Sequence, residues 1–304
     1  MSKSKFSGWR AGLASAVLLG AVLPPGAARA ATLENIRAAQ EIVVAHRDAS
    51  VPFSYLDEKV RPVGYSMDIC LKLVEAVRRE LGMPTLAVRY LSVTSANRIA
   101  ALMQGKAALE CGSTTNTAER RKQVAFTIPH FISAARLLVR SDSGFHALDG
   151  LAGRTVAVTA GTTTVPTLRR QNAEHDLRLK IVEAADHAQA FARLEKGEVD
   201  AFALDDVLLY GLRANSARPQ SFDVVGKALS IEPYAIMLPP GDAAFKKVID
   251  SEMRRLIISG EIQLIYRRWF QQPIPPKGIN LELPMPAMLR DSFRFPSDKV
   301  GDLE

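Results

Sequence analysis

The chain repeats one pattern of strands and helices twice, and this repetition constrains its fold more than any other feature. Short apolar runs expected to form strands lie at 42–45, 86–90 and 107–109, and again at 155–158, 178–182 and 201–204. Amphipathic stretches expected to form helices separate these runs. Leu102-x-x-Gly105 and Leu194-x-x-Gly197 occupy matching places before the third strand of each set. The sequence therefore predicts two similar α/β lobes with mainly parallel sheets.

Two further apolar segments, 137–140 and 234–238, are expected to be strands that join the lobes. The chain would enter the second lobe through one and return through the other, which leaves a cleft between the lobes. This assigns residues 31–138 and 236–304 to lobe 1 and residues 139–235 to lobe 2. The proline-rich tail from Gln271 is expected to run along lobe 1 rather than to form a domain.

The first thirty residues have the features of a cleavable signal peptide. A basic start precedes the apolar stretch 11–23, which is too short to span a membrane well, and Ala28-Arg29-Ala30 fits a cleavage site. The alternative is an uncleaved membrane anchor. Residues 1–30 contain four of the 39 basic residues and no acidic ones, so the mature charge is 35 − 32 = +3. That balance argues against nucleic acid as a partner.

The chain contains only two cysteines, Cys70 and Cys111. An exported protein could pair them. Cys70 also fits the apolar stripe of the helix expected at 64–81, where a buried thiol is an equally good interpretation. The two cysteines have no CxxC spacing and no clustered histidines, so the sequence suggests no metal site.

The segment 110–121 (ECGSTTNTAERR) is the strongest candidate for a binding site. It provides hydroxyl groups and backbone N–H groups where a strand leads into a helix, and Arg120 follows one helical turn later. Such donors suit a carboxylate. In parallel sheets, ligands bind at the carboxyl ends of strands, and Arg47, Thr162–Thr164 and Asp205 also follow expected strands.

No catalytic motif accompanies these groups. The sequence lacks a G-x-S-x-G elbow, a Walker loop, a G-x-G-x-x-G after a strand and an H-E-x-x-H helix. The five histidines are scattered, and nothing pairs a nucleophile with a base. The sequence therefore favours binding without chemistry, and no cofactor is expected.

Several motifs together resemble a known family. HRDASVPFSY, SANRI, ECGSTTNTAERRKQVAF, TAGTTT, DHAQAF, LDD and RWFQQPIPPKGIN occur in the order found in periplasmic glutamate/aspartate-binding proteins of ABC importers. These belong to the solute-binding proteins for polar amino acids. The resemblance implies an α/β fold of the type II periplasmic binding protein class, with two lobes joined by two crossing strands. The cysteine that it leads us to expect at 234–237 is absent, so its disulfide does not transfer.

The resemblance also implies roles for individual residues. The α-carboxylate would meet Arg120, Thr115 and the backbone around Thr163, and the α-ammonium would meet Asp205 and Ser113. The carboxylate of the ligand's side chain would meet Arg47, Arg98, Ser95 and, from lobe 2, His187.

Each assignment has a plainer alternative. Arg120 lies in a basic run that solvent could cover, Arg98 could pair with a nearby carboxylate, and Arg47 could pair with Asp48. His187 follows the expected N-cap Asp186 and could be an exposed helix residue. Of the adjacent Asp205 and Asp206, one could simply cap the next helix.

These observations lead to one functional hypothesis. The chain is expected to be a monomeric periplasmic protein that binds L-glutamate or L-aspartate and delivers it to an inner-membrane ABC permease. The alternatives are a dehydratase-like enzyme on the same fold, a binder of another polar amino acid such as glutamine, and a sensory module of a receptor. The enzyme alternative is less favoured, because such an enzyme needs a general acid in its cleft, whereas arginines predominate in the cleft expected here.

Overall fold

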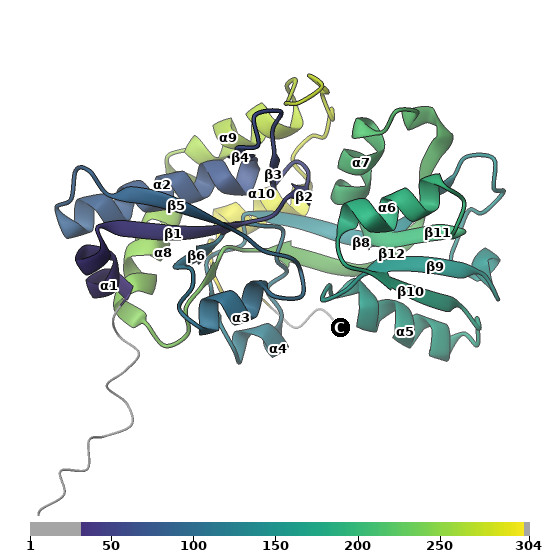
Figure 1. Ribbon diagram of the computed structural model, residues 1–304, viewed down its shortest axis with the longest axis horizontal. Helices are drawn as coiled ribbons and strands as arrows, with labels where there is room; N and C mark the ends of the chain where they lie inside the picture. The colour runs from purple at the N-terminus through teal and green to yellow at the C-terminus, as the bar shows by residue number, and fades with distance from the viewer. Residues whose placement is uncertain (1–31, 301–304) are drawn as a thin grey trace, which may run out of the picture.

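The computed structural model describes residues 32–300, which form two α/β lobes lying side by side (Figure 1). The signal peptide expected at residues 1–30 lies outside this range. Each lobe contains one five-stranded sheet. The fold class predicted from the repeated pattern is therefore confirmed. Between residues 32 and 300, no helix has the length and apolar character needed to cross a bilayer.

The sheet of lobe 1 has the strand order β5-β1-β6-β13-β7. Its strands are β1 (Glu41–His46), β5 (Ala87–Ser92), β6 (Leu109–Glu110), β7 (Ala125–Phe126) and β13 (Met237–Leu238). β1 is parallel to β5 and β6, whereas β13 is antiparallel to β6 and β7. A small antiparallel sheet of β2 (Ala49–Ser50), β3 (Ser54–Leu56) and β4 (Pro62–Val63) lies beside it.

The helices of lobe 1 are α1 (Thr32–Ala39), α2 (Tyr65–Leu81), α3 (Arg98–Met103), α4 (Ala118–Arg121), α8 (Ala243–Ile258) and α9 (Glu261–Phe270). α2 was predicted almost to the residue, because its apolar stripe and the closing Gly82 both mark it. It packs against α8 and α9. The N-cap of α3 is Asn97, so the side chain of Ser95 is not used to cap this helix.

The sheet of lobe 2 has the order β10-β9-β11-β8-β12. Its elements are β8 (Phe131–Arg140), η1 (Asp149–Leu151), β9 (Thr155–Thr159), α5 (Thr164–Glu174), β10 (Lys180–Ala184), α6 (His187–Glu195), β11 (Ala201–Asp205), α7 (Asp206–Asn215), η2 (Pro219–Ser221) and β12 (Phe222–Tyr234). β10 begins two residues later than predicted, because Arg178 has a φ of 55°, which is incompatible with a strand. Asp186 caps α6 as predicted and accepts a hydrogen bond from the Gln189 backbone.

β8 and β12 are long antiparallel strands that run from one lobe into the other (Figure 1). The prediction of short crossing strands at 137–140 and 234–238 is wrong in extent. β12 ends at Tyr234, and residues 237–238 instead form β13 in the sheet of lobe 1. Sequence patterns missed most of β12 because charged residues interrupt it, and pairing with β8 decides its conformation.

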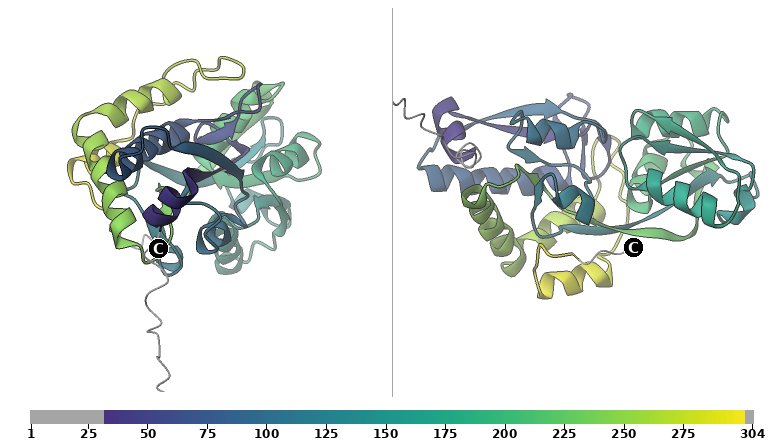
Figure 2. Two further views of the ribbon diagram at one scale, coloured as in Figure 1. Left: turned by 60° about the vertical axis from the view of Figure 1, so that its left-hand side comes forward. Right: turned by 90° about the horizontal axis from the view of Figure 1, so that it is seen from below.

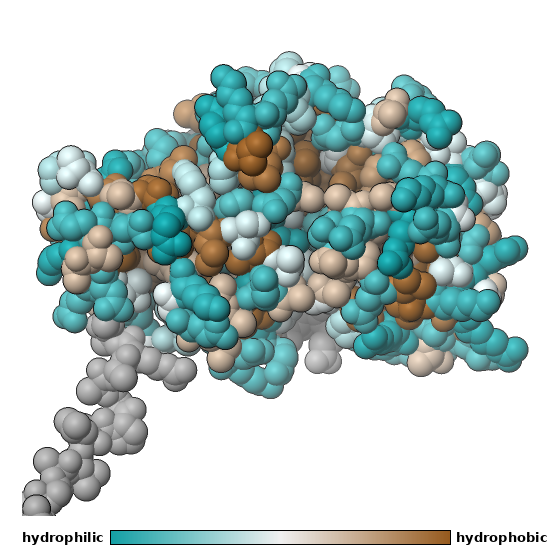
Figure 3. Space-filling view, in the orientation of Figure 1, coloured by the Kyte–Doolittle hydropathy of each residue, from teal (hydrophilic) through white to brown (hydrophobic). Residues whose placement is uncertain are grey.

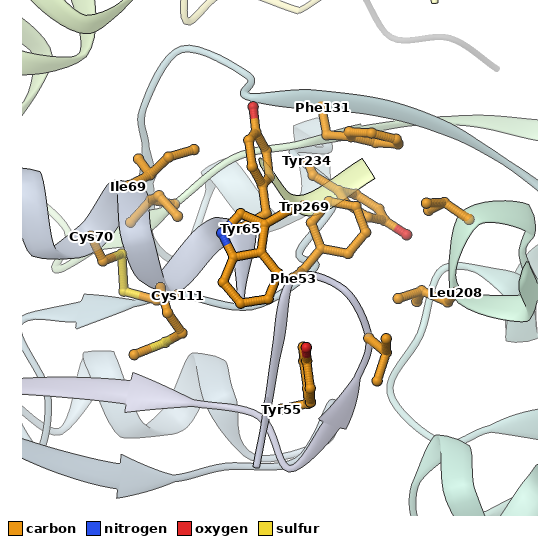
Figure 4. Packing of buried hydrophobic residues seen from close by; sticks show 14 of the residues in the cluster. Phe53, Tyr55, Tyr65, Ile69, Cys70, Cys111, Phe131, Leu208, Tyr234 and Trp269 are labelled. Carbon is orange, nitrogen blue, oxygen red and sulfur yellow. A yellow bond between two sulfur atoms is a disulfide. The ribbon is translucent and has the colours of Figure 1, made fainter. Parts of the chain in front are cut away.

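Cys70 of α2 and Cys111 after β6 form a disulfide, which resolves the alternative that the sequence left open. The bond joins α2 to the segment that carries the candidate site. Beside it, Phe53, Tyr65 and Phe131 pack in a fully buried aromatic cluster (Figure 4). The ring centroids of Phe53 lie 4.9 Å from Phe131 and 5.0 Å from Tyr234. Contacts with this aromatic cluster therefore hold the loop after β1 in place.

The tail after α9 lies along lobe 1, as Figure 2 shows. The backbone N–H of Leu283 donates to Phe270 O at 2.9 Å, and Tyr266 donates to Pro284 O at 3.2 Å. A helix that the sequence did not predict, α10 (Ala287–Arg294), buries Leu289 against lobe 1. The face shown in Figure 3 is mostly polar, with apolar residues in scattered groups.

Candidate functional site

The predicted site residues meet where the carboxyl ends of the two sheets face each other. A small enclosed cavity is lined there by Ser95, Arg98, Ser113, Thr115, Thr162, Thr163, His187, Leu204, Asp205 and Leu208. The two predicted residues outside this lining, Arg47 and Arg120, are nevertheless buried. The structure therefore brings all nine predicted residues to one region, although they are spread along the sequence from Arg47 to Asp205.

Arg98 is held by a short chain of hydrogen bonds. Its Nη1 donates to Thr114 Oγ1 at 2.5 Å, and Thr114 Oγ1 donates to Glu110 Oε2 at 2.7 Å. Burial lowers the pKa of Arg98, and the charge of Glu110 opposes that shift. Arg98 Nε has no partner among residues 32–300. The guanidinium is thus fixed in position and still has a hydrogen to donate.

Arg47 lies next to Arg98, at the end of β1. Burial, and then the charge of Arg98, lower the pKa of Arg47 to about 10. Its Nη1 atom has no hydrogen-bond partner in the described part of the chain, while its backbone N–H donates to Ser54 Oγ at 2.9 Å. Two buried guanidiniums of like charge favour an anion between or beside them. The alternative that Arg47 pairs with Asp48 is not what the structure records; the imidazole of His46 lies 3.4 Å from Asp48 instead.

Arg120 spans the gap between the lobes. Its Nη1 donates to Thr115 O at 2.9 Å in lobe 1, and its Nη2 donates to Gly161 O at 3.2 Å in lobe 2. Burial, and then the charge of Arg98, lower the pKa of Arg120 to about 9, although Glu232 opposes the shift. The side chain is only 8% exposed, so it is not part of a solvated basic run.

Asp205 and Asp206 have different roles. Asp206 accepts hydrogen bonds from Ser133 Oγ and from its neighbour Val207 N, both at 2.7 Å. Asp205 accepts one from the hydroxyl of Tyr234, and its Oδ1 is unpartnered among the described residues. Burial, and then Glu232, raise the pKa of Asp205 well above 3.8, while the bond from Tyr234 lowers it. Asp205 therefore presents an acceptor to the cavity, and Asp206 does not.

His187 and Ser95 approach the cavity from opposite lobes. His187 is 1% exposed, and its Nδ1 lies 2.8 Å from Thr159 Oγ1. Burial, and then the charges of Arg47 and Arg98, lower its pKa well below 6.5, so the ring is neutral at pH 7. Within residues 32–300, His187 Nε2 and Ser95 Oγ have no hydrogen-bond partner. The interpretation of His187 as an exposed helix residue is wrong.

The hydroxyl groups of Thr115 and Thr163 bind a residue that was not predicted from the sequence. Both hydroxyls donate to Glu232 Oε2 of β12, at 2.6 Å and 2.8 Å. Glu110 and Tyr234 were also missed. The signal for Glu110 and Glu232 was a carboxylate within or directly after an apolar run, where a charge is costly without partners. Ser113, the remaining predicted residue, is 5% exposed and lines the cavity.

Taken together, the site balances three arginines against three carboxylates. Arg47, Arg98 and Arg120 face Glu110, Glu232 and Asp205. Within the described part of the chain, the charged groups of this set with unsatisfied atoms are the donors Arg47 Nη1 and Arg98 Nε and the acceptors Glu110 Oε1 and Asp205 Oδ1. That set matches a molecule with both anionic and cationic groups. The geometry suits enclosure of a zwitterion with an additional negative charge.

The two lobes touch backbone to backbone beside the cavity. A Cβ atom on Gly161 would lie 2.6 Å from Ala96 Cα, and one on Gly211 would lie 2.5 Å from Val51 O. Both distances are below any normal contact. These two glycines therefore permit the close approach of lobe 2 to lobe 1.

Comparisons with known proteins find relatives that match most of the chain. The model of the bacterial extracellular solute-binding proteins, family 3, matches residues 42–272. The L-glutamate/L-aspartate-binding protein of Pseudomonas aeruginosa is 45% identical over 272 residues, covering 89% of this chain and 90% of that protein. The glutamate/aspartate import solute-binding protein of Escherichia coli K12 is 40% identical over 290 residues, covering 95% and 96%.

Solved structures show the same fold. The P235GK mutant of ArgBP from T. maritima matches with a TM-score of 0.69 and 26% identity, over 79% of this chain and 99% of that one. An ancestral arginine-binding protein bound to glutamine matches with a TM-score of 0.65 and 27% identity, over 76% and 98%. The curated relatives are named as solute-binding proteins and not as enzymes. The chain therefore belongs to the bacterial extracellular solute-binding proteins of family 3.

Proposed function

We propose that this protein captures L-glutamate and L-aspartate in the cavity between its lobes and delivers them to an ABC permease. The observation that carries the proposal is the buried set of Arg47, Arg98 and Arg120 with Asp205. In the described residues, unsatisfied donors on Arg47 and Arg98 and an unsatisfied acceptor on Asp205 have the polarity of an acidic amino acid. The two curated relatives described above bear names that state the same ligands.

The ligand is proposed to lie with its backbone groups toward Arg120 and Asp205. Arg120 would meet the α-carboxylate, aided by Thr115 through a group other than its hydroxyl, which donates to Glu232, and by the backbone near Thr163. Asp205 with Ser113 would meet the α-ammonium. Burial strengthens these contacts, because the cavity excludes most of the water that would compete. This arrangement accounts for recognition of any α-amino acid.

The acidic side chain is proposed to lie toward Arg47 and Arg98. Ser95 and neutral His187 add hydrogen bonds from the two lobes. A neutral side chain such as that of glutamine would leave two buried, closely spaced guanidiniums to share the negative charge of Glu110, which is costly. The proposed preference is therefore for a carboxylate, and glutamine is the alternative ligand to test.

Export and partners complete the proposal. Residues 1–30 would direct export to the periplasm and be cleaved there, and the mature protein would act as a monomer without nucleic acid or cofactor. Lobe 1 is proposed to comprise residues 31–138 and 236–304, and lobe 2 residues 139–235. Ligand binding would stabilise the closed arrangement, because only that arrangement brings Arg120 and Asp205 to the same molecule.

Isothermal titration of the mature chain with L-glutamate, L-aspartate and L-glutamine tests the proposal. Saturable heat with one or both acidic amino acids, and weaker or no heat with glutamine, is the expected result. If neither acidic amino acid binds, the proposed function is wrong. Incubation with prephenate, followed by ultraviolet absorbance, tests the dehydratase alternative, and no turnover is expected.

A further inference from the structure

Glu232 is a buried carboxylate that links the two lobes. It lies on crossing strand β12 and is 2% exposed. Its Oε2 accepts hydrogen bonds from Thr115 of lobe 1 and Thr163 of lobe 2, and its Oε1 accepts one from Ser230. A carboxylate with this many donors has a fixed position. None of the proposed contacts with an acidic amino acid involves Glu232.

Two spaces meet at Glu232. Thr115 and Thr163 line both the enclosed cavity and an outer cleft of about 650 Å³. Glu232 lines the outer cleft and does not line the cavity. Because its carboxylate binds the hydroxyls of both threonines, it lies at the boundary between the two spaces. The outer cleft continues between α4 and α5, which face each other across the lobes in Figure 1.

We propose that Glu232 determines specificity for ligand length, by closing the end of the cavity at which the α-carboxylate is held. This inference rests on the proposed function, in which Arg120 and Thr115 meet that carboxylate. The α-carboxylate of a free amino acid would be the last group before the boundary at Glu232. In an α-linked dipeptide the same carbon continues into a peptide bond and a second residue, which would have to pass between Thr115 and Thr163, where the Glu232 carboxylate lies.

The space beyond the boundary is suited to a second residue once the boundary is opened. Lys122 and Arg170 line the outer cleft and bring positive charge to it. Lys122 pairs with Glu119 at 2.6 Å, and both side chains are exposed, so that pair is weak and exchangeable. A C-terminal carboxylate displaced into the cleft would meet these cations. Glu232 thus separates a chamber for one amino acid from a cleft that fits a longer ligand.

Titration of the wild type and of Glu232→Ala with L-glutamate, α-glutamyl-alanine and γ-glutamyl-alanine tests this proposal. The wild type should strongly prefer glutamate to α-glutamyl-alanine. Glu232→Ala should narrow that preference by about tenfold or more, because the removed atoms open the boundary. The γ-linked isomer should stay excluded from both proteins, because its extension lies at the end that holds Arg47 and Arg98.

Glu232→Gln is the matched control, since it keeps the volume and removes the charge. It should keep the wild-type preference; if it narrows the preference as much as Glu232→Ala does, charge and not bulk is responsible, and the proposal fails. Should Glu232→Ala not fold, Glu232→Ser replaces it, because its short side chain opens the same boundary and its hydroxyl can bind water there. An unchanged preference in the folded Ala or Ser variant overturns the proposal.

The failure of the two proposals can be distinguished. If the wild type binds neither glutamate nor aspartate, the proposed function is wrong. The boundary is then tested with whichever free amino acid does bind and with its α-linked alanyl peptide. A wild type that binds that peptide as well as the free amino acid overturns the role of Glu232 by itself.

Discussion

The two lobes have similar sheets and present opposite charges from them. In lobe 1, Arg47 follows β1, Arg98 begins α3 and Arg120 lies in α4. In lobe 2, the corresponding edge carries Asp205 at the end of β11 and a neutral His187 at the start of α6. The fold thus places these two sets of residues opposite each other, and in the proposed function each lobe holds a different group of the ligand. A ligand that carries both a carboxylate and an ammonium group could therefore contact both lobes at once.

Removal of an arginine from lobe 1 should have the largest effect. Arg98→Met should weaken glutamate binding by about 2–5 kcal/mol, which corresponds to roughly thirty- to several-thousand-fold in Kd. The loss is large because the carboxylate of the ligand's side chain would lose one of its two proposed buried arginine partners. Isothermal titration measures it. Arg89→Met, which removes an exposed ion pair with Glu41, is the control and should leave Kd almost unchanged. Unaltered binding by Arg98→Met would refute the proposed charge division.

Blocking the contact between the lobes should have the next largest effect. Gly211→Ala adds a Cβ that would lie 2.5 Å from Val51 O, so the closed arrangement becomes strained. Gly211 lies within α7, where alanine favours the helix by about 1 kcal/mol. We therefore expect glutamate affinity to fall about tenfold or more while the unfolding temperature of the ligand-free protein does not fall.

Gly150→Ala is the matched control, because its added Cβ would meet only Phe145 at 4.0 Å, an ordinary contact. Small-angle scattering with and without glutamate reports closure directly. If Gly211→Ala closes and binds like Gly150→Ala, the backbone contact does not limit the approach of the lobes.

Loss of the hydroxyl at Tyr234 should have a moderate effect on glutamate binding, through the pKa of Asp205 in lobe 2. The hydrogen bond from Tyr234 lowers the pKa of Asp205, whereas burial and Glu232 raise it. In Tyr234→Phe the pKa therefore rises further. Because the α-ammonium needs an ionised Asp205, binding should weaken at a higher pH during acidification than in the wild type. The Kd for glutamate measured between pH 4 and 8 checks this, and a parallel pH profile would contradict it.

The smallest effect on binding is expected at His130, a buried histidine outside the cavity. Its pKa is lowered to about 3 by burial, against 6.5 in the unfolded chain. The unfolded state therefore binds a proton that the folded state does not, so stability falls as pH decreases from about 6.5 towards 3. His130→Phe should remove this loss, about 2 kcal/mol at pH 5, without changing glutamate affinity at pH 7.

Thermal unfolding of ligand-free wild type and variant at pH 7 and pH 5 measures the difference. Phenylalanine suits the position because Phe53 and Tyr65 surround the ring, with centroids 6.3 Å and 5.5 Å away. Equal acid sensitivity in the two proteins would assign the pH dependence to the charged groups of the site instead.

Local patterns in the sequence predicted much of the fold. α2, the N-cap Asp186 and β11 followed from apolar periodicity and from residues that begin or end elements. The crossing strand β12 did not, because its conformation depends on pairing with β8, whose partner residues lie about ninety positions away. The helix α10 was missed for a similar reason: its apolar residues have meaning only against lobe 1.

The sequence by itself determined the two-lobed fold and the places of Arg47 and Asp205 at strand ends, because strand ends and charged residues are local features. Tertiary structure alone decided that Cys70 and Cys111 pair and that Glu110 and Glu232 share the site. These outcomes depend on which distant groups become neighbours once water is excluded. The role of a buried charge depends on those neighbours, and they cannot be identified from the linear sequence.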